Sequence, residues 1–293
     1  QSGVMDKVIE DTIRKIGGEG LELSTEELIL EVGFVINCKI AMRLVQAFKV
    51  KVSVELHPAV SRNIKRTLHY GRRYFKVCPE FFIIKVPLTP EGYLAVRKLT
   101  QEKIPVNFTL GFSARQNYLA ARLSNPDFVN VFLGRLNQVV IDHKAGSGDQ
   151  VGEKVTLATQ NALIDAREKY KDVQSRLIGA SVRNGEQVAF LAGLDVLTIP
   201  PKAIKEFQES TKPADQIVSH LAEDIVPGID TSHALAKRFP SLWEMPDALI
   251  SFVDALMAEK GLDGMSANEL VGFCRKHDMN LFHSFNEAEF KKI

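Results

Sequence analysis

The sequence predicts an α/β fold in which helices cover a mainly parallel sheet. Short apolar runs alternate along the chain with segments whose apolar residues recur at helical spacing. The runs lack the strict apolar–polar alternation of a half-exposed sheet, so we expect strands that are buried on both faces. Repetition of strand, helix and strand then indicates parallel strands joined by right-handed crossovers.

Two helices are expected before the first strand. One covers residues 6–16, and the second begins at a capping box formed by Ser24 and Glu27 and continues through Phe48. The six predicted strands are 50–56, 81–88, 106–110, 128–134, 176–182 and 195–200. The predicted helices between and after them are 58–74, 90–102, 113–123, 152–172, 184–193 and 202–210.

The last part of the chain has a helical pattern without an identifiable strand. Its apolar-periodic segments read LWEMPDALISFVDALMAEKGL, SANELVGFCRKHD and NEAEFKKI. We therefore expect residues 1–210 to form the β/α domain and residues 211–293 to form a helical extension that packs on it.

Composition excludes some partners. The formal net charge is only +1, from 37 basic and 36 acidic residues, so no global field attracts nucleic acid or an anionic membrane. No apolar run approaches the roughly 20 residues of a membrane span, and no signal-peptide pattern opens the chain. We expect a cytoplasmic protein without nucleic-acid or membrane partners. The three cysteines are far apart, which predicts reduced thiols rather than a disulfide or metal framework.

Polar residues gather where the predicted strands end. Because the carboxyl ends of parallel strands meet at one edge, such residues converge on a pocket in a closed β/α barrel or on a crevice in an open sheet. The residues concerned are Glu55, Lys85, Asn107, Thr109, Asn130, Arg135, Ser181 and Arg183.

The run FFIIKVP places Lys85 among apolar residues. Desolvation disfavours an ammonium group, so a neutral amine there could attack a carbonyl and form a Schiff base. Arg135 and Arg183 could hold a phosphate by bidentate hydrogen bonds. Together these residues indicate an enzyme acting on a phosphorylated sugar. The alternative is that Lys85 extends from a strand end into solvent and the arginines pair with helix carboxylates.

Other site patterns are weak or missing. Gly146, Gly148 and Gly152 lie in a stretch that lacks a Walker lysine, which favours an ordinary loop. The histidines form no HExxH motif, and His57 is expected to be structural or exposed rather than catalytic. No nucleophile elbow of the GxSxG type occurs.

Several longer stretches carry a family resemblance. The segments are FIIKVPLTPEGYLAVRKL, PVNFTLGFSARQNYLAA, FVNVFLGRL, IGASVRNGEQVAFLAGLDVLTIPPKAIKEF and VSVELHPAVS. Along residues 50–210 they resemble motifs of the transaldolase family, which comprises class I, Schiff-base-forming enzymes, in the family's order. The resemblance implies a (β/α)8 TIM barrel of the class I aldolase type.

The resemblance has gaps. The family's first two strands, which carry an aspartate and a TTNPS-like turn, are not found, so only six barrel strands are expected here. We expect that a native N-terminal segment of about 50 residues is lacking, since an eight-stranded barrel needs both strands to close. In addition, Asn130 stands where the family usually has serine.

The resemblance also implies catalytic roles. Lys85 would form the Schiff base, and Glu55 would act as acid and base through a catalytic water. Thr109 would help to hold that water, and Asn107 would contact the sugar hydroxyls or the neighbourhood of the Schiff base.

The remaining implied residues would bind substrate. Arg135 and Arg183 would hold the phosphate, with Asn130 and Ser181 in further substrate contacts. Phe132 lies where family members have phenylalanine or tyrosine beside the water. The resembling fructose-6-phosphate aldolases carry glutamine and tyrosine at the positions of Glu55 and Phe132, so the pair found here points to transaldolase.

The implied reaction transfers a dihydroxyacetone unit from sedoheptulose 7-phosphate or fructose 6-phosphate to an aldose phosphate, in the pentose phosphate pathway. It needs no metal or organic cofactor, because the protonated imine is the electron sink. Two alternatives stay open: a related class I aldolase on another sugar phosphate, and a non-catalytic barrel that binds a sugar phosphate. The sequence leaves the oligomeric state open, with a homodimer as one candidate.

Overall fold

The computed structural model describes residues 5–18 and 23–282. Its six strands form one sheet in chain order, and every neighbouring pair runs parallel. The strands are β1 (Val52–Glu55), β2 (Phe82–Pro87), β3 (Val106–Gly111), β4 (Phe128–Phe132), β5 (Arg176–Ala180) and β6 (Val196–Leu197). The α/β fold and the six predicted strands are confirmed.

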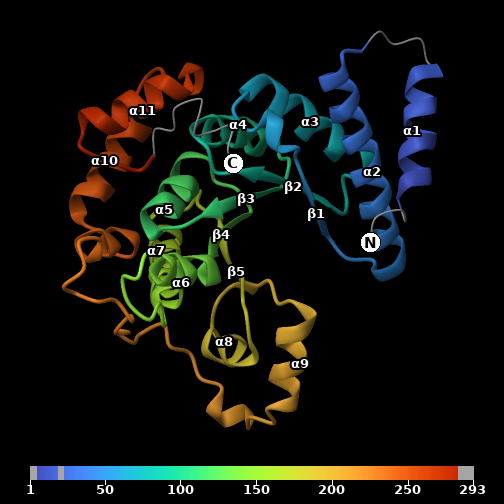
Figure 1. Ribbon diagram of the computed structural model, residues 1–293. Coiled ribbons are helices and arrows are strands. Elements are labelled where there is room, and N and C mark those ends of the chain that lie inside the picture. Colours follow the sequence, from blue (N-terminus) through green and yellow to red (C-terminus); the bar gives the residue numbers. More distant parts are fainter. Residues whose placement is uncertain (1–4, 19–22, 283–293) are drawn as a thin grey trace.

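The sheet is a curled half-barrel. Within the described residues, β1 pairs only with β2 and β6 pairs only with β5, so the two outer strands do not close on each other. Figure 1 shows the sheet at the centre with helices around it. The arrangement agrees with a TIM-barrel-type aldolase in which six strands are present, and it leaves β1 as an edge strand.

Eleven α-helices are described. They are α1 (Asp6–Gly18), α2 (Thr25–Phe48), α3 (Ile64–Val77), α4 (Pro90–Gln101), α5 (Ala114–Leu123), α6 (Leu133–Asp142), α7 (Val151–Lys169), α8 (Gly185–Phe190), α9 (Pro201–Glu209), α10 (Asp247–Met257) and α11 (Ala267–Lys276). The predicted capping box is confirmed at α2. The side chain of Ser24 accepts a hydrogen bond from the Glu27 N–H, and the Glu27 carboxylate accepts one from the Ser24 N–H.

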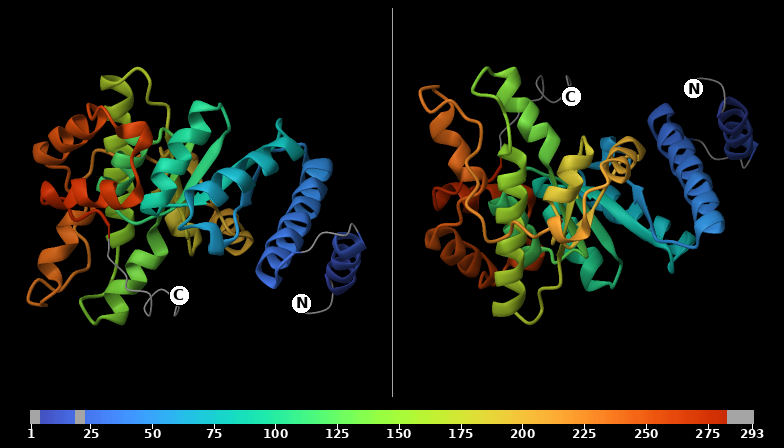
Figure 2. Two further views of the ribbon diagram at one scale, coloured as in Figure 1. Left: turned by 90° about the horizontal axis from the view of Figure 1, so that it is seen from above. Right: turned by 90° about the horizontal axis from the view of Figure 1, so that it is seen from below.

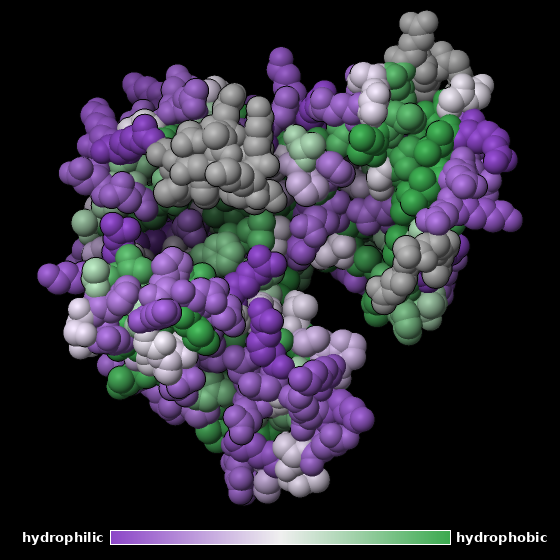
Figure 3. Space-filling model, viewed as in Figure 1, coloured by the Kyte–Doolittle hydropathy of each residue, from purple (hydrophilic) through white to green (hydrophobic). Residues whose placement is uncertain are grey.

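Helix α2 carries apolar side chains at its surface as well as in the core. Figure 3 shows apolar surface gathered over the part of the molecule that α1 and α2 form. Leu30, Ala41 and Val45 of α2 are buried, whereas the exposed large apolar residues of this helix are Ile29, Ile40, Leu44 and Phe48. The other described elements therefore cover only part of the apolar surface of α2.

Helix α6 was not expected from the sequence. The predicted strand 128–134 ends at Phe132, where its pairing with β5 also ends, and the chain turns directly into α6. Leu133, Leu136 and Val140 of α6 are buried and recur at helical spacing. The helical signal was therefore present, but the apolar strand run hid its start.

The outer face of the sheet forms the core. In β2, Phe82, Ile84 and Val86 are almost fully buried, whereas Lys85 on the opposite, inner face is only partly covered. Neighbouring residues of a strand point to opposite faces, so the helices cover one face of β2, and Lys85 lies with the apolar Ile83 on the inner face. Parallel strands therefore read as apolar runs with isolated polar residues.

Helices α10 and α11 lie beyond α4 and α5, at the end of the molecule opposite α1 and α2 (Figure 2). Leu249, Phe252 and Leu256 of α10 are buried in the same apolar cluster as the sheet. An ion pair of 2.8 Å from Arg97 on α4 to Asp263 adds a polar link. The expected helical segment at 286–293 lies outside the described residues.

The chain between α9 and α10 is less helical than its sequence pattern indicated. Only two 3-10 segments occur in it, Ala214–Gln216 and Ala236–Leu242. Four prolines interrupt this stretch, and proline removes a backbone donor and clashes with the preceding turn of a helix. They are Pro213, Pro227, Pro240 and Pro246.

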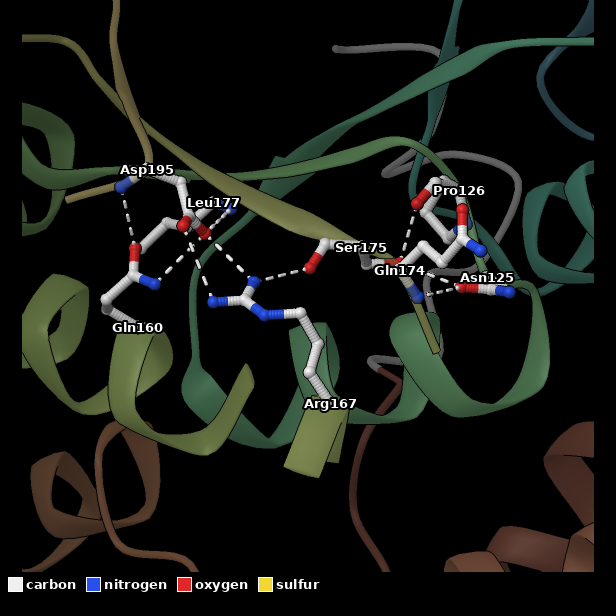
Figure 4. Close-up of polar contacts among 8 residues, drawn as sticks. All are labelled: Asn125, Pro126, Gln160, Arg167, Gln174, Ser175, Leu177 and Asp195. Atoms are coloured by element: carbon white, nitrogen blue, oxygen red, sulfur yellow. Dashed lines mark hydrogen bonds and ion pairs between the residues drawn. The ribbon is translucent and has the colours of Figure 1, made fainter. Parts of the chain in front are cut away.

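Asp195 ties the amino ends of β5 and β6 to α7 (Figure 4). Its Oδ2 accepts hydrogen bonds of 3.0 Å from the Leu177 N–H, from Gln160 Nε2 and from Arg167 Nη1. Arg167 also donates to the carbonyl of Ser175 at 2.8 Å. Burial by itself would raise the pKa of Asp195, but these hydrogen bonds and the charge of Arg167 hold it below its usual range.

The cysteines are free, as predicted. Burial raises the pKa of the Cys38 thiol to about 11 and that of Cys274 to about 12, which makes both poor nucleophiles. Among residues 5–18 and 23–282, no cluster of His, Cys, Asp and Glu is arranged to hold a metal ion. None of the helices in those ranges is long and apolar enough to cross a membrane.

Candidate active site

Three of the predicted site residues lie side by side on neighbouring strands. Glu55 of β1 is in register with Lys85 of β2, and Lys85 is in register with Asn107 of β3. Residues in register on parallel strands point to the same face of a sheet. The carboxylate, the amine and the amide therefore share the inner face of the half-barrel.

Lys85 and Glu55 form an ion pair. Lys85 Nζ lies 3.2 Å from Glu55 Oε2, and the side chains are 26% and 52% exposed. The amine is thus directed at a carboxylate rather than extended alone into solvent, which was the alternative prediction. The Lys85 side chain is also more exposed to solvent than its apolar sequence neighbours suggested. Its partner Glu55 lies on β1, which has no further strand beside it in the described part of the chain.

A chain of hydrogen bonds orients two amides next to the lysine. Asn130 Nδ2 donates to Asn107 Oδ1 at 2.7 Å, and Asn107 Nδ2 donates to Ser53 Oγ at 3.1 Å. The Leu110 N–H donates to Asn130 Oδ1 at 3.1 Å. Both asparagines are buried, so these contacts fix the direction of each amide.

Sequence reasoning missed Ser53. It lies two residues before Glu55 on β1, and that spacing along a strand places both side chains on one face. The alternation was a usable signal, but a serine at the middle of a short strand is not distinctive by itself.

Thr109 is fully buried, yet its Oγ1 has no hydrogen-bond partner among the described residues. Leaving a buried hydroxyl unpaired costs about 1–3 kcal/mol. The contact of Thr109 with a catalytic water stays a prediction. The register of β3 and β4 shifts between Phe108 and Gly111, and Leu110 has a φ of 69°. Such a bulge redirects side chains at the end of a strand.

The two arginines follow the carboxyl ends of β4 and β5. Arg135 lies in the first turn of α6, with its guanidinium carbon 5.6 Å from the ring centroid of Phe132. Arg183 passes over Gly134, where an added Cβ would lie only 2.6 Å from Arg183 Nε. Gly134 therefore lets the Arg183 side chain lie against the backbone beside Arg135.

Both guanidinium groups are free to bind an anion. Within the described chain, neither Arg135 nor Arg183 forms an ion pair with a carboxylate, which the alternative prediction required. Both residues are exposed. The N-terminus of α6 adds unpaired backbone N–H groups that favour negative charge at the same place.

Ser181 follows β5 in the left-handed region, with a φ of 65°. Its carbonyl oxygen would be 2.4 Å from a Cβ on Gly134, so the turn after β5 packs closely on the start of α6. The side chain is half-buried, and its contact with substrate stays a prediction.

The structure thus brings the predicted residues into two groups that share β4. Asn130 belongs to the group with Lys85, Glu55 and Asn107, and Phe132 belongs to the group with the arginines. These two β4 residues point to the same face and are separated by about 7 Å along the strand. The inner face therefore joins an amine–carboxylate pair to the end of β4 that carries Phe132 and is followed by Arg135.

A parallel half-barrel with such an inner face defines an enzyme of the β/α-barrel class. The chain belongs to the transaldolase/fructose-6-phosphate aldolase family, whose sequence profile matches residues 3–241. The prediction drawn from the sequence motifs is confirmed.

Three relatives named "Probable transaldolase" show the extent of the similarity. The protein from Hyphomonas neptunium is 32% identical over 170 residues, which cover 57% of this chain and 66% of the relative. The protein from Exiguobacterium sibiricum is 32% identical over 59% of this chain and 73% of the relative. The protein from Nitrosopumilus maritimus is 33% identical over 56% of this chain and 68% of the relative. The chain thus spans about two thirds of the length of these relatives.

Proposed function

We propose that this chain is a transaldolase that transfers a dihydroxyacetone unit through a Schiff base on Lys85. The donor would be sedoheptulose 7-phosphate or fructose 6-phosphate, and the acceptor an aldose phosphate, in the pentose phosphate pathway of the cytoplasm. The observation that carries the proposal is the placement of Lys85 Nζ 3.2 Å from the Glu55 carboxylate on adjacent strands. Family membership supports the same reaction.

The ion pair supplies the first proton transfer. Glu55, directly or through a water, removes a proton from the Lys85 ammonium, and the free amine attacks the ketone carbon of the donor. The carbinolamine then loses water, with Glu55 returning the proton to the leaving hydroxyl. The product is a protonated imine between Lys85 and the substrate.

Cleavage follows from the charge on that imine. Glu55, ionised again after the dehydration, accepts the proton of the β-hydroxyl through a water, the bond between the α and β carbons breaks, and its electron pair moves to the imine nitrogen. An aldose phosphate leaves, and the dihydroxyacetone unit stays on Lys85 as an enamine. The enamine carbon attacks the aldehyde of the acceptor, and hydrolysis of the new imine restores the amine.

The amides and the threonine would orient the substrate. Asn107 and Asn130 are fixed by their mutual hydrogen bond of 2.7 Å, so they can meet sugar hydroxyls without reorganising. The unpaired Oγ1 of Thr109 can accept a hydrogen bond from the catalytic water or donate one to it. This preorganisation favours catalysis over simple binding.

The arginines would bind the phosphate of both donor and acceptor. Neither Arg135 nor Arg183 forms an ion pair with a carboxylate among the described residues, and the Arg183 side chain lies against Gly134, the residue before Arg135. A planar guanidinium matches two phosphate oxygens, so two of them can neutralise a dianion. Ser181 lies in the same turn as Arg183 and is positioned to add a hydroxyl contact.

One observation favours a second candidate, a barrel that binds a sugar phosphate without turning it over. The Glu55 side chain is 52% exposed on the edge strand. A carboxylate that is exposed to solvent is less effective in proton transfer to a bound substrate than one from which water is excluded. The two candidates share the arginine site and differ in whether Lys85 reacts.

Borohydride trapping separates these candidates. The full chain is incubated with fructose 6-phosphate and reduced, and its intact mass and peptides are measured. A transaldolase is expected to carry a three-carbon adduct on Lys85, and the Lys85→Ala variant none. A folded protein that binds fructose 6-phosphate but gains no adduct would contradict the proposed chemistry and support the binding candidate. Steady release of free dihydroxyacetone in the presence of erythrose 4-phosphate would instead indicate an aldolase.

A further inference from the structure

A buried carboxylate lies behind the arginine site. Glu153, in the first turn of α7, is only 4% exposed and pairs with no cation among the described residues. Its two oxygens instead accept hydrogen bonds from two side-chain amides, those of Asn137 and Gln187. Burying a carboxylate whose partners are only side-chain amides costs free energy, so a carboxylate at this place in the fold calls for an explanation.

One oxygen is linked to the helix that carries Arg135. Asn137 Nδ2 donates to Glu153 Oε2 at 3.0 Å, and Asn137 Oδ1 accepts the Gly152 N–H at 2.6 Å. Asn137 lies in α6, two residues after Arg135. The pair of contacts therefore fixes the first turns of α6 against the start of α7.

The other oxygen is linked to the turn that carries Arg183. Gln187 Nε2 donates to Glu153 Oε1 at 2.7 Å, and Gln187 Oε1 accepts the backbone N–H of Arg183 at 2.7 Å. A single amide thus connects the carboxylate to the backbone of the second arginine. Asn137, Glu153 and Gln187 all line a cavity between α6, α8 and α9.

We propose that Glu153 is a positioning residue that holds the Arg135 and Arg183 segments at the spacing that binds one phosphate group. This inference rests on the proposed function, in which the two arginines bind the substrate phosphate. Glu153 acts through Asn137 and Gln187 and does not touch the substrate.

The chemistry of the network explains why a carboxylate is used. Both amides present N–H donors to residue 153, and only a carboxylate accepts from both without offering a donor of its own. Its negative charge lies at the N-terminus of α7, where the helix dipole stabilises an anion. An amide at position 153 would set an NH2 group against one of its two donor partners.

The test is calorimetric titration of the full chain with inorganic phosphate. Glu153→Gln is expected to raise the Kd for phosphate at least about tenfold, since one charge-assisted hydrogen bond is lost. Glu168→Gln, an exposed change near the other end of α7, is the matched control and is expected to leave the Kd unchanged. With fructose 6-phosphate as substrate, Glu153→Gln should raise KM while kcat changes little.

A second variant separates positioning from a folding defect. Glu153→Gln combined with Gln187→Glu exchanges the carboxylate and the amide between the two positions. The new amide at position 153 can donate to the new carboxylate at position 187 and accept from Asn137, while that carboxylate accepts the Arg183 N–H. Every hydrogen bond of the network is restored, and the phosphate Kd is expected to return toward that of the wild type. Unchanged phosphate binding in folded Glu153→Gln would overturn the inference, as would a lower kcat at unchanged KM.

The outcome also distinguishes this inference from the proposed function. If the wild type binds phosphate and forms the Lys85 adduct while Glu153→Gln binds equally well, only the positioning role fails. If the wild type binds no phosphate, the arginine site fails and the inference falls with it. The adduct on Lys85 then reports independently on the Schiff-base chemistry.

Discussion

Asn130 on β4 donates a hydrogen bond of 2.7 Å to Asn107 on β3, and this contact joins the two strands across the inner face of the half-barrel. Asn130 also accepts the Leu110 N–H at the bulge of β3. Asn130 therefore orients the side chain of Asn107, which is predicted to contact substrate. It also provides a hydrogen-bond acceptor for the backbone N–H of Leu110. It occupies the position where the resemblance led us to expect serine, whose shorter side chain is less suited to make both contacts.

Replacing Asn130 by alanine is expected to weaken both stability and activity. The Leu110 N–H and Asn107 Oδ1 would lose their partner, at a cost of about 1–3 kcal/mol for each buried group left unpaired. Urea denaturation should show the loss, and kcat with fructose 6-phosphate should fall about tenfold or more, because Asn107 would be held only by its hydrogen bond to Ser53. Gln138→Ala, on the exposed face of α6, is the control. Equal stability and activity of Asn130→Ala would show that these amide contacts are not needed.

Glu55→Gln tests the carboxylate of the ion pair. Glutamine keeps the size of the side chain but cannot take a proton, so kcat should fall by about 10²–10⁴-fold. The rate of borohydride-trapped adduct formation on Lys85 is the direct measurement, with thermal unfolding as a check of the fold. Because Glu80 is also an exposed acidic residue, Glu80→Gln serves as the control. Adduct formation at the wild-type rate would remove Glu55 from the mechanism.

Arg183→Lys tests phosphate recognition at the turn after β5. Lysine keeps the charge but loses the planar, bidentate donor set, so KM for fructose 6-phosphate should rise about tenfold or more. Turnover of an unphosphorylated donor such as fructose should change little, which separates phosphate binding from general damage. Arg176→Lys, at the exposed start of β5, is the matched change. A parallel loss with both donors would argue against a phosphate role for Arg183.

Asp195 makes the stability depend on pH. Its pKa is lowered in the folded state by the hydrogen bonds from Leu177, Gln160 and Arg167, although burial opposes this. A group with a lowered folded-state pKa stabilises fully above its unfolded value of about 3.9, and that contribution is lost as the pH falls toward the folded value. Asp195→Asn should therefore be less stable than wild type at pH 7, by about 1–3 kcal/mol.

Urea denaturation as a function of pH is the measurement for Asp195. The difference between wild type and Asp195→Asn should shrink as the pH falls below about 4, because the wild-type carboxylate becomes protonated. Asp165→Asn, an exposed change on α7, should show no such convergence. A constant difference across this range would mean that the ionised form of Asp195 contributes nothing.

Much of the fold could be predicted because its signals are local. The capping box of Ser24 and Glu27, the apolar strand runs and the helical periodicities all depend on residues close in sequence. Helix α6 was missed where strand and helix signals overlap at Leu133, and proline-rich residues 211–246 were read as more helical than they are. At Leu133 the preceding apolar strand run hid the helical spacing of α6. In residues 211–246 the prolines prevent the regular helix that the apolar pattern indicated.

The site was predicted in part for the same reason. The charged residues at strand ends stand out in the sequence: Lys85, Glu55 and the two arginines. The sequence by itself determined the candidate chemistry from these residues, and the order of strands and helices and the family from its apolar patterns and motifs. Only the tertiary structure decided that Ser53 joins Asn107, that Thr109 is left unpaired, and that Glu153 links the segments of both arginines. These contacts join residues that are distant along the chain or lie on different elements, and hydrogen bonding acts over about 3 Å in space whatever the sequence separation.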